Sequence, residues 1–172
     1  MINLESIWSD LLKENKMRKP SFILITIMIM VLILSVVPVS ASSPPAKVMF
    51  EVQTIIPEGG PNYGSFVATG PAVDEGIVCA SGETTDVDFH ASGFQSDRGV
   101  NFQVVKLFTC DDGSGEFSVK LQVRVDRRGN NYNWNIVGGT GSYEKLHGTG
   151  AGTGLPTPEG VLDIFNGKLH ID

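Results

Sequence analysis

Basic residues are scarce in this sequence, most of all in the part that follows residue 41. The whole chain carries 13 Lys and Arg against 19 Asp and Glu, for a formal net charge of −6. Beyond residue 41 the chain holds nine basic and sixteen acidic residues. Proteins that bind nucleic acid or anionic lipid rely on basic patches. The composition therefore excludes both as expected partners of the folded part.

Charge is missing altogether from residues 21–41, SFILITIMIMVLILSVVPVSA. Basic residues precede this run and small residues end it, which is typical of a secretory signal peptide. The run also approaches the ~20 residues that span a bilayer, so an uncleaved anchor over 21–41 is the alternative. We predict a secreted or extracytoplasmic protein that meets a membrane only through this segment, if it stays uncleaved. The predicted parts are an upstream extension (1–16), a signal peptide or anchor (17–41), a flexible lead (42–46) and a folded domain (47–172).

Cysteine is nearly absent, and the two examples are Cys79 and Cys110. An even pair in an exported protein commonly forms a disulfide, so we predict a bond between them. Closing a loop of about 30 residues would stabilise the fold by about 3–4 kcal/mol on the chain-entropy account. The alternatives are two free thiols and a catalytic Cys–His pair.

Familiar catalytic signatures are also missing. The sequence contains no G-x-S-x-G, H-E-x-x-H or C-x-x-C motif, which mark serine hydrolases, zinc proteases and thiol redox sites. The phosphate-binding G-x-x-x-x-G-K-[ST] loop does not occur, and a dinucleotide pattern starting at Gly139 fails because position 144 is Glu. We therefore predict no cofactor and no metal, and we favour a protein that is not an enzyme.

What the sequence does have is alternation with a period of two. The clearest run, EFSVKLQVRV at 116–125, places apolar side chains on one face and polar ones on the other, as in a strand with one buried face. Residues 47–172 show no amphipathic helix of ten residues, and the last strand can pair with the first. This favours an all-β fold, a closed antiparallel barrel of about eight strands, over the alternative of a β-sandwich. Strands are expected at 47–56, 64–70, 75–81, 84–91, 101–110, 116–125, 131–138, 146–154 and 160–171.

Glycine is abundant, and it alternates along one segment. Four glycines would share one face of an extended strand: Gly148, Gly150, Gly152 and Gly154. Glycine weakens a strand interior, so four in register indicate close approach by another group. That group is a large side chain, the tight bend of a small barrel, or a ligand. The expected covering rings are Trp134, Phe117 and Phe165.

The stretch WNIVGGTGSYEKLHGTG (134–150) resembles the late-strand signature of the allene oxide cyclase and dirigent-type barrel superfamily. FTCDDGSGEF (108–117) followed by that stretch also resembles a group of exported microbial proteins of unknown function. The resemblance covers residues 100–155 and implies an eight-stranded antiparallel barrel, often with a central cavity. It carries over no catalytic residue, because the matching positions look architectural: Gly138, Gly139, Gly141, Tyr143 and Gly148.

Two groups of residues with metal-binding side chains are candidate metal sites. Asp86, Asp88 and His90 recur at every second position and offer the ligand types of a divalent cation. Same-face neighbours on a strand stand about 6.5–7 Å apart, so we expect these three side chains on a solvated outer face. The acidic segment 111–116 lacks the spacing of a calcium-binding loop. We expect a hairpin turn there.

Tyr143, Glu144 and His147 lie beside the glycine cluster. They could donate and accept protons at a barrel mouth, although a structural role in a turn is the simpler expectation. Together with Trp134, the residues Tyr143 and His147 are the candidate ligand-binding positions, and no catalytic residue is assigned.

The sequence leaves three functions open. The first is a non-catalytic binding or surface-associated module that holds a small apolar ligand in the barrel lumen. The second is a cyclase- or isomerase-like enzyme that confines a reactive substrate. The third is a structural exported protein that forms homo-oligomers. The first two require a lumen cavity of at least ~300 Å³, whereas the third expects a lumen filled with Phe, Leu, Val and Trp.

Overall fold

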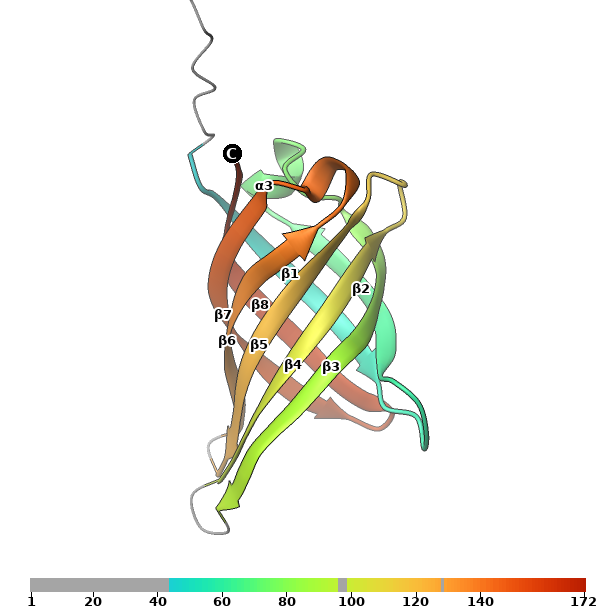
Figure 1. Cartoon of the computed structure of the whole chain (residues 1–172), viewed down its shortest axis with the longest axis vertical. Coiled ribbons are helices and arrows are strands. Elements are labelled where there is room, and N and C mark those ends of the chain that lie inside the picture. The colour runs from blue at the N-terminus through green and yellow to red at the C-terminus, as the bar shows by residue number, and fades with distance from the viewer. Residues whose placement is uncertain (1–43, 96–98, 128) are drawn as a thin grey trace, which may run out of the picture. The chain divides into compact units, whose positions relative to one another are not determined.

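The computed structural model describes residues 44–95, 99–127 and 129–172, apart from the side chains of 92–95. These residues form one closed antiparallel barrel whose strands follow one another in chain order (Figure 1). The prediction of an all-β closed barrel is confirmed, and the sandwich alternative is wrong. The strands are β1 (Ala46–Ile55), β2 (Tyr63–Thr69), β3 (Ser81–Gln95), β4 (Gly99–Cys110), β5 (Glu116–Asp126), β6 (Gly129–Gly139), β7 (Leu146–Thr157) and β8 (Gly160–Ile171).

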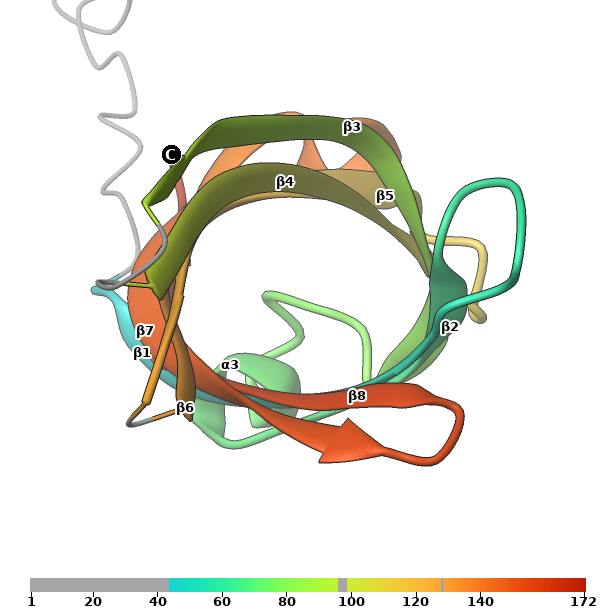
Figure 2. The ribbon, with the colours of Figure 1, turned by 90° about the horizontal axis from the view of Figure 1, so that it is seen from below.

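The barrel closes because its last strand pairs with the whole length of its first strand. The register of β1 and β8 runs from Ala46 opposite Leu169 to Ile55 opposite Gly160, with Phe50 opposite Phe165. Seen from below, the ribbon forms a continuous ring (Figure 2). Closure removes the exposed edges that an open sheet would present to other chains.

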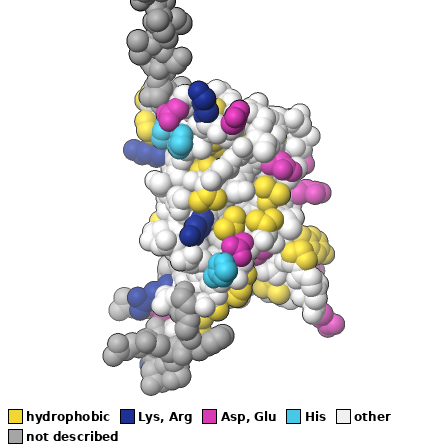
Figure 3. Space-filling view, viewed as in Figure 1, with side chains coloured by type: hydrophobic (Ala, Val, Ile, Leu, Met, Phe, Trp, Pro, Cys, Tyr) yellow, Lys and Arg dark blue, Asp and Glu magenta, His cyan; other side chains and the backbone are white. Residues whose placement is uncertain are grey.

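Side chains alternate between the interior and the outer surface along the strands. In β5, Phe117, Val119 and Leu121 are buried, while the residues between them are half-buried or exposed. The alternation follows from the pleat, which points successive side chains to opposite faces. On the face seen in Figure 3, acidic and basic side chains are interspersed among uncharged ones.

The expected strand at 75–81 is wrong. The chain instead leaves β2 through the short helix α3 (Pro71–Asp74) and a series of turns that return to β3. The N–H groups of Ile77 and Val78 donate to the carbonyl of Ala72 over 2.8 and 3.2 Å, so these residues form local turns instead of a strand. Only at Ala80, next to β3, does the segment bond to β2, through the N–H of Ala68. Ala72, Ile77 and Val78 are buried, and Figure 2 shows this connection across the far end of the ring. Its apolar residues therefore cap the barrel.

Aromatic rings fill the half of the barrel that lies beneath this cap, which we call the closed half. The ring centroids of Phe108 and Phe117 lie 4.9 Å apart, and those of Phe66 and Phe108 lie 5.0 Å apart. Burying one such ring contributes about 1.5–3 kcal/mol, so this cluster is a main source of stability. Its fully buried phenylalanines are Phe50, Phe66, Phe108, Phe117 and Phe165.

The alternating glycines of β7 face these interior side chains. A Cβ at Gly150 would lie 2.6 Å from Nε1 of Trp134, closer than such atoms come in proteins, and one at Gly152 would overlap the ring of Tyr132. At Gly148 the obstacle is Leu169. The glycine face is thus filled by protein side chains. Tyr132 covers it, which the sequence did not indicate, whereas Phe117 stacks on Phe108.

The predictions for residues 1–16 and 17–41 lie outside the described residues, as does the start of the 42–46 lead. Among the residues that the structure does describe, no helix has the length and apolar character needed to cross a bilayer.

Candidate functional site

The other half of the barrel, which we call the open half, is hollow. A cavity of about 230 Å³ lies there, partly open to solvent. Its lining residues, which include Ile56, Asn62 and Val161, belong to the end of the barrel away from α3. Figure 1 shows this end, where the strand pairs β1–β2, β3–β4, β5–β6 and β7–β8 are joined. The apolar walls of the cavity come from inward positions of four strands: Phe89, Phe102, Val104, Leu121, Val123 and Val161.

A buried polar cluster forms the floor of the cavity. Nζ of Lys106 donates to Oδ1 of Asp86 over 2.5 Å and to Oγ1 of Thr54 over 3.3 Å. Thr54 in turn donates to Oδ2 of Asp163 over 3.2 Å, and Nδ2 of Asn62 donates to Oδ2 of Asp86 over 2.9 Å. The side chain of Lys106 is 3% exposed and that of Asp86 is 12% exposed. Hydrogen bonds and opposite charge offset the large cost of burying these groups.

Burial perturbs the carboxyl of Asp163 at the floor. Burial raises its pKa to about 6, against the lowering effects of Lys106 and of the hydrogen bond from Thr54; Asp86 adds to the rise. Desolvation disfavours the charged form of a buried acid, and here it outweighs the attraction of the nearby ammonium. The carboxyl therefore changes charge close to neutral pH.

Two polar atoms beside this floor lack a partner among the described residues. They are the hydroxyl of Tyr132 and Oδ1 of Asn130, both from residues that line the cavity. Tyr132 is 4% exposed, and burial, with the charge of Asp163 as a second cause, raises its pKa. Buried polar groups usually have partners, so orphaned ones mark places where another molecule can bind.

Asp86 reaches the floor because it shares the inward face of the buried Thr84, two residues earlier in β3. The register with β4 shifts between Asp86, which pairs with Lys106, and Asp88, which pairs with Val105. Val87 is the extra residue and points to solvent, 55% exposed. The expectation that Asp86 lies on the outer face with Asp88 and His90 is therefore wrong, because the bulge between Asp86 and Asp88 changes the face of the residues beyond it. Asp88 and His90 do lie outside, where Nε2 of His90 is 3.2 Å from Oδ2 of Asp88.

Sequence reasoning also missed Lys106, Thr54 and Asp163, although a signal was present. Each occupies the same parity as a buried aromatic residue of its own strand: Phe108, Phe50 and Phe165 respectively. Parity fixes which face a side chain occupies. Polar residues at inward positions of three strands thus indicated a polar layer inside the barrel.

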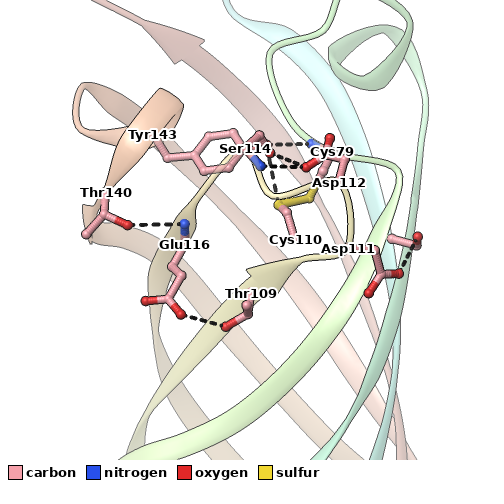
Figure 4. Close-up of a disulfide and its surroundings, with 10 residues drawn as sticks. Cys79, Thr109, Cys110, Asp111, Asp112, Ser114, Glu116, Thr140 and Tyr143 are labelled. Atoms are coloured by element: carbon pink, nitrogen blue, oxygen red, sulfur yellow. Dashed lines mark hydrogen bonds between the residues drawn. A yellow bond between two sulfur atoms is a disulfide. The ribbon is translucent and has the colours of Figure 1, made fainter.

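The predicted disulfide is present in the closed half, between Cys79 and Cys110, whose Cα atoms lie 6.0 Å apart (Figure 4). It ties the cap to the end of β4. The hydroxyl of Tyr143 accepts a hydrogen bond from the N–H of Cys79 over 3.1 Å and lies 2.7 Å from Oγ of Ser114. Tyr143 therefore links the cap to the β4–β5 hairpin by hydrogen bonds. It lies in the closed half and does not line the cavity.

The acidic segment 111–116 is the hairpin between β4 and β5. Asp112 accepts hydrogen bonds from the hydroxyl and the backbone N–H of Ser114, and these bonds hold its pKa below the ordinary value. Within the described ranges, no three His, Cys, Asp or Glu side chains are grouped so that they could hold a metal ion.

The structure does not bring the three candidate ligand-binding residues together. Trp134 lies in the aromatic core, and Tyr143 lies at the disulfide. His147 is on the outer surface, stacked on His170 and 3.2 Å from Asp172. None of them lines the cavity of the open half.

No family model matches the chain, and no curated protein matches it. Among solved structures, it is similar to a protein of unknown function from the DUF3224 family of Shewanella oneidensis MR-1. The identity is 14% and the TM-score 0.40, over 75% of this chain and 98% of that one. These comparisons do not test the resemblance to the allene oxide cyclase and dirigent-type superfamily, which stays a prediction.

Proposed function

We propose that this protein is an exported, non-catalytic binding module that holds one small, mainly apolar ligand in the cavity of the open half. The observation that carries the proposal is the contrast inside one barrel. Aromatic rings pack one half fully, while the other keeps about 230 Å³ of space between apolar walls. A purely structural barrel would gain stability by filling that space, because dispersion contacts are lost around a void.

The volume limits the ligand. At about 230 Å³ it falls below the ~300–1,000 Å³ of pockets for drug-sized molecules, and so below the ~300 Å³ expected of a binding or enzymatic lumen. It exceeds the ~150 Å³ of an engineered cavity that binds benzene. A molecule of one or two rings, or a short branched chain, fits this range.

Export is part of the proposal. The Cys79–Cys110 bond supports an oxidising compartment, since disulfides are rare where glutathione keeps thiols reduced. The apolar run at 21–41 supports a signal peptide.

The test uses the protein secreted from an oxidising host and titrated with 2-phenylethanol in a calorimeter. We expect saturable binding at one site. Val123→Trp fills the cavity and should abolish it, while Gln122→Trp adds the same ring to the outer face of β5 and should not. If Val123→Trp fails to fold, Val161→Phe replaces it as the test, because it narrows the cavity from β8 and should weaken binding. No saturable binding, or equal binding by Val123→Trp, would contradict the proposal.

One observation favours the enzyme alternative. A carboxyl with a pKa of about 6 beside a cavity can exchange protons with a substrate near neutral pH. A ligand retained through purification, identified by native mass spectrometry, would then take up deuterium at carbon when incubated with the protein in heavy water. Loss of that exchange in Asp163→Asn would support an isomerase, and its absence in the original protein would reject one.

A further inference from the structure

The floor of the cavity is unbalanced in charge. Lys106 and Asp86 satisfy each other directly, and Asn62 bonds the second oxygen of Asp86. Asp163 accepts a hydrogen bond from Thr54 at Oδ2, and its Oδ1 has no hydrogen-bond donor among the described residues. One ammonium therefore faces two carboxyls, and the unmatched carboxyl is Asp163.

Two polar groups near Asp163 also lack a hydrogen-bond partner among the described residues. Oδ1 of Asn130 is an acceptor without a partner in the described part of the chain, and the buried hydroxyl of Tyr132 lacks one too. A ligand that reaches this corner must supply an N–H or O–H group to satisfy the oxygen of Asn130, while the hydroxyl of Tyr132 can donate or accept.

The walls suit a cation as well as an apolar body. The rings of Phe89 and Phe102 lie 5.4 Å apart at the cavity mouth, and Tyr132 lines the same space. Aromatic faces attract ammonium groups, more strongly when water is excluded. Rings combined with a carboxylate are thus a chemical match for an amine.

We propose that the ligand is a small aromatic or aliphatic amine, whose ammonium head binds Asp163 and whose apolar body lies against the walls of the open half. This inference rests on the proposed binding function and specifies its ligand class. Carboxylates and phosphates are disfavoured at the same place, because Asp163 would repel them.

Binding of such an amine should depend on pH. The groups that face Asp163 are Lys106 from β4, Asp86 from β3 and Tyr132 from β6, with uncharged Thr54 from β1 and Gly154 from β7. Its pKa of about 6 means that the carboxyl loses its charge as the pH falls through that value. Amines remain protonated there, so their affinity should fall while that of a neutral ligand should not.

The experiment compares three probes that share one ring: 2-phenylethylammonium, 2-phenylethanol and phenylacetate. Each is titrated calorimetrically into the secreted protein at pH 7.5 and pH 5. At pH 7.5 we expect the amine to bind about 10- to 100-fold more tightly than the alcohol, as for a hydrogen bond to a charged group, and phenylacetate to bind most weakly. At pH 5 the ratio of amine to alcohol should shrink.

Asp163→Asn keeps the shape and removes the charge, so it should abolish the preference for the amine and retain alcohol binding. Asp88→Asn, which removes an outer carboxylate of β3, is the matched control and should keep the preference. Equal affinities for amine and alcohol would overturn this inference and leave the binding module standing. Failure of every probe would overturn the proposed function itself. If Asp163→Asn does not fold, a ratio that stays constant between pH 7.5 and pH 5 still rejects Asp163 as the partner.

Discussion

The closed and open halves of this barrel are built from the same strands, yet one is a packed core and the other is a polar-floored cavity. On each of three strands, the interior changes from an aromatic to a polar side chain within two to four residues. Phe50 gives way to Thr54 on β1, Phe108 to Lys106 on β4, and Phe165 to Asp163 on β8, all at inward positions. The pairing of β1 with β8 stays regular across this change, whereas β3 bulges opposite Lys106. The closed ring therefore accommodates either kind of interior.

The closed half offsets the free-energy cost of buried charge and empty space in the open half. Burying Lys106 with two carboxyls is unfavourable unless every charge is well paired, and a void forfeits packing contacts. The aromatic cluster, the cap and the disulfide lie at the opposite end, where they hold the ring closed. Proteins commonly concentrate stability in one region and keep destabilising groups at the site of function.

The largest expected difference between the halves is in the cost of losing one aromatic ring. Phe108→Ala should lower the free energy of unfolding by about 3–5 kcal/mol, because it leaves a cavity among buried rings. Phe89→Ala, at the mouth and 60% exposed, should cost less than about 1 kcal/mol. Urea unfolding of both variants measures this. Similar losses would mean that the two halves are equally well packed.

The second prediction concerns the carboxyl of the open half. Asp163 has a folded pKa of about 6, raised from 3.8, so the folded state holds its proton more tightly than the unfolded chain does. The stability this gives is fully present below pH 3.8 and is lost as the pH rises through about 6. Asparagine does not titrate, so the stability of Asp163→Asn relative to the original protein should rise by about 2–3 kcal/mol between pH 4 and pH 7.

Urea unfolding at a series of pH values tests this, with Asp88→Asn as the exposed control. A relative stability of Asp163→Asn that does not change with pH would show that the carboxyl is solvated, and that the open half has no buried polar floor.

The smallest expected effect concerns the glycine face. Gly150→Ala would place a methyl group 2.6 Å from the ring of Trp134 and against the backbone of Asn166, so it should cost about 1–3 kcal/mol through overpacking. Gly138→Ala meets no atom within 4 Å and should change stability by less than about 0.5 kcal/mol. Thermal unfolding of the pair provides the measurement. Equal effects would mean that no side chain presses on β7.

The parts of the fold that could be predicted are those set by alternation along one strand. The run at 116–125 specifies its own buried face, and the glycines of β7 indicate that another group must approach them. The disulfide followed from an even pair of cysteines. In each case the information lies within one segment or in the composition.

The rest depends on relations between segments, which periodicity does not contain. The sequence predicts a strand at 75–81, but most of that segment belongs to the cap, because Ile77 and Val78 hydrogen-bond back to Ala72. The bulge at Val87 places Asp86 on the opposite face from Asp88 and His90, and only the register with β4 reveals it. Lys106, Thr54 and Asp163 each look like an isolated polar residue in an apolar run, and their meeting requires the closed ring.

Methyl NMR of the protein titrated with 2-phenylethanol tests the central claim, that the open half is a binding site and the closed half is a filled core. The account predicts shifts at the methyl groups of Val104, Leu121 and Val123, which line the cavity, and none at Val48 or Ala68, which are buried near the cap. Shifts in the closed half or on the outer surface, or no shifts at saturating probe, would contradict it.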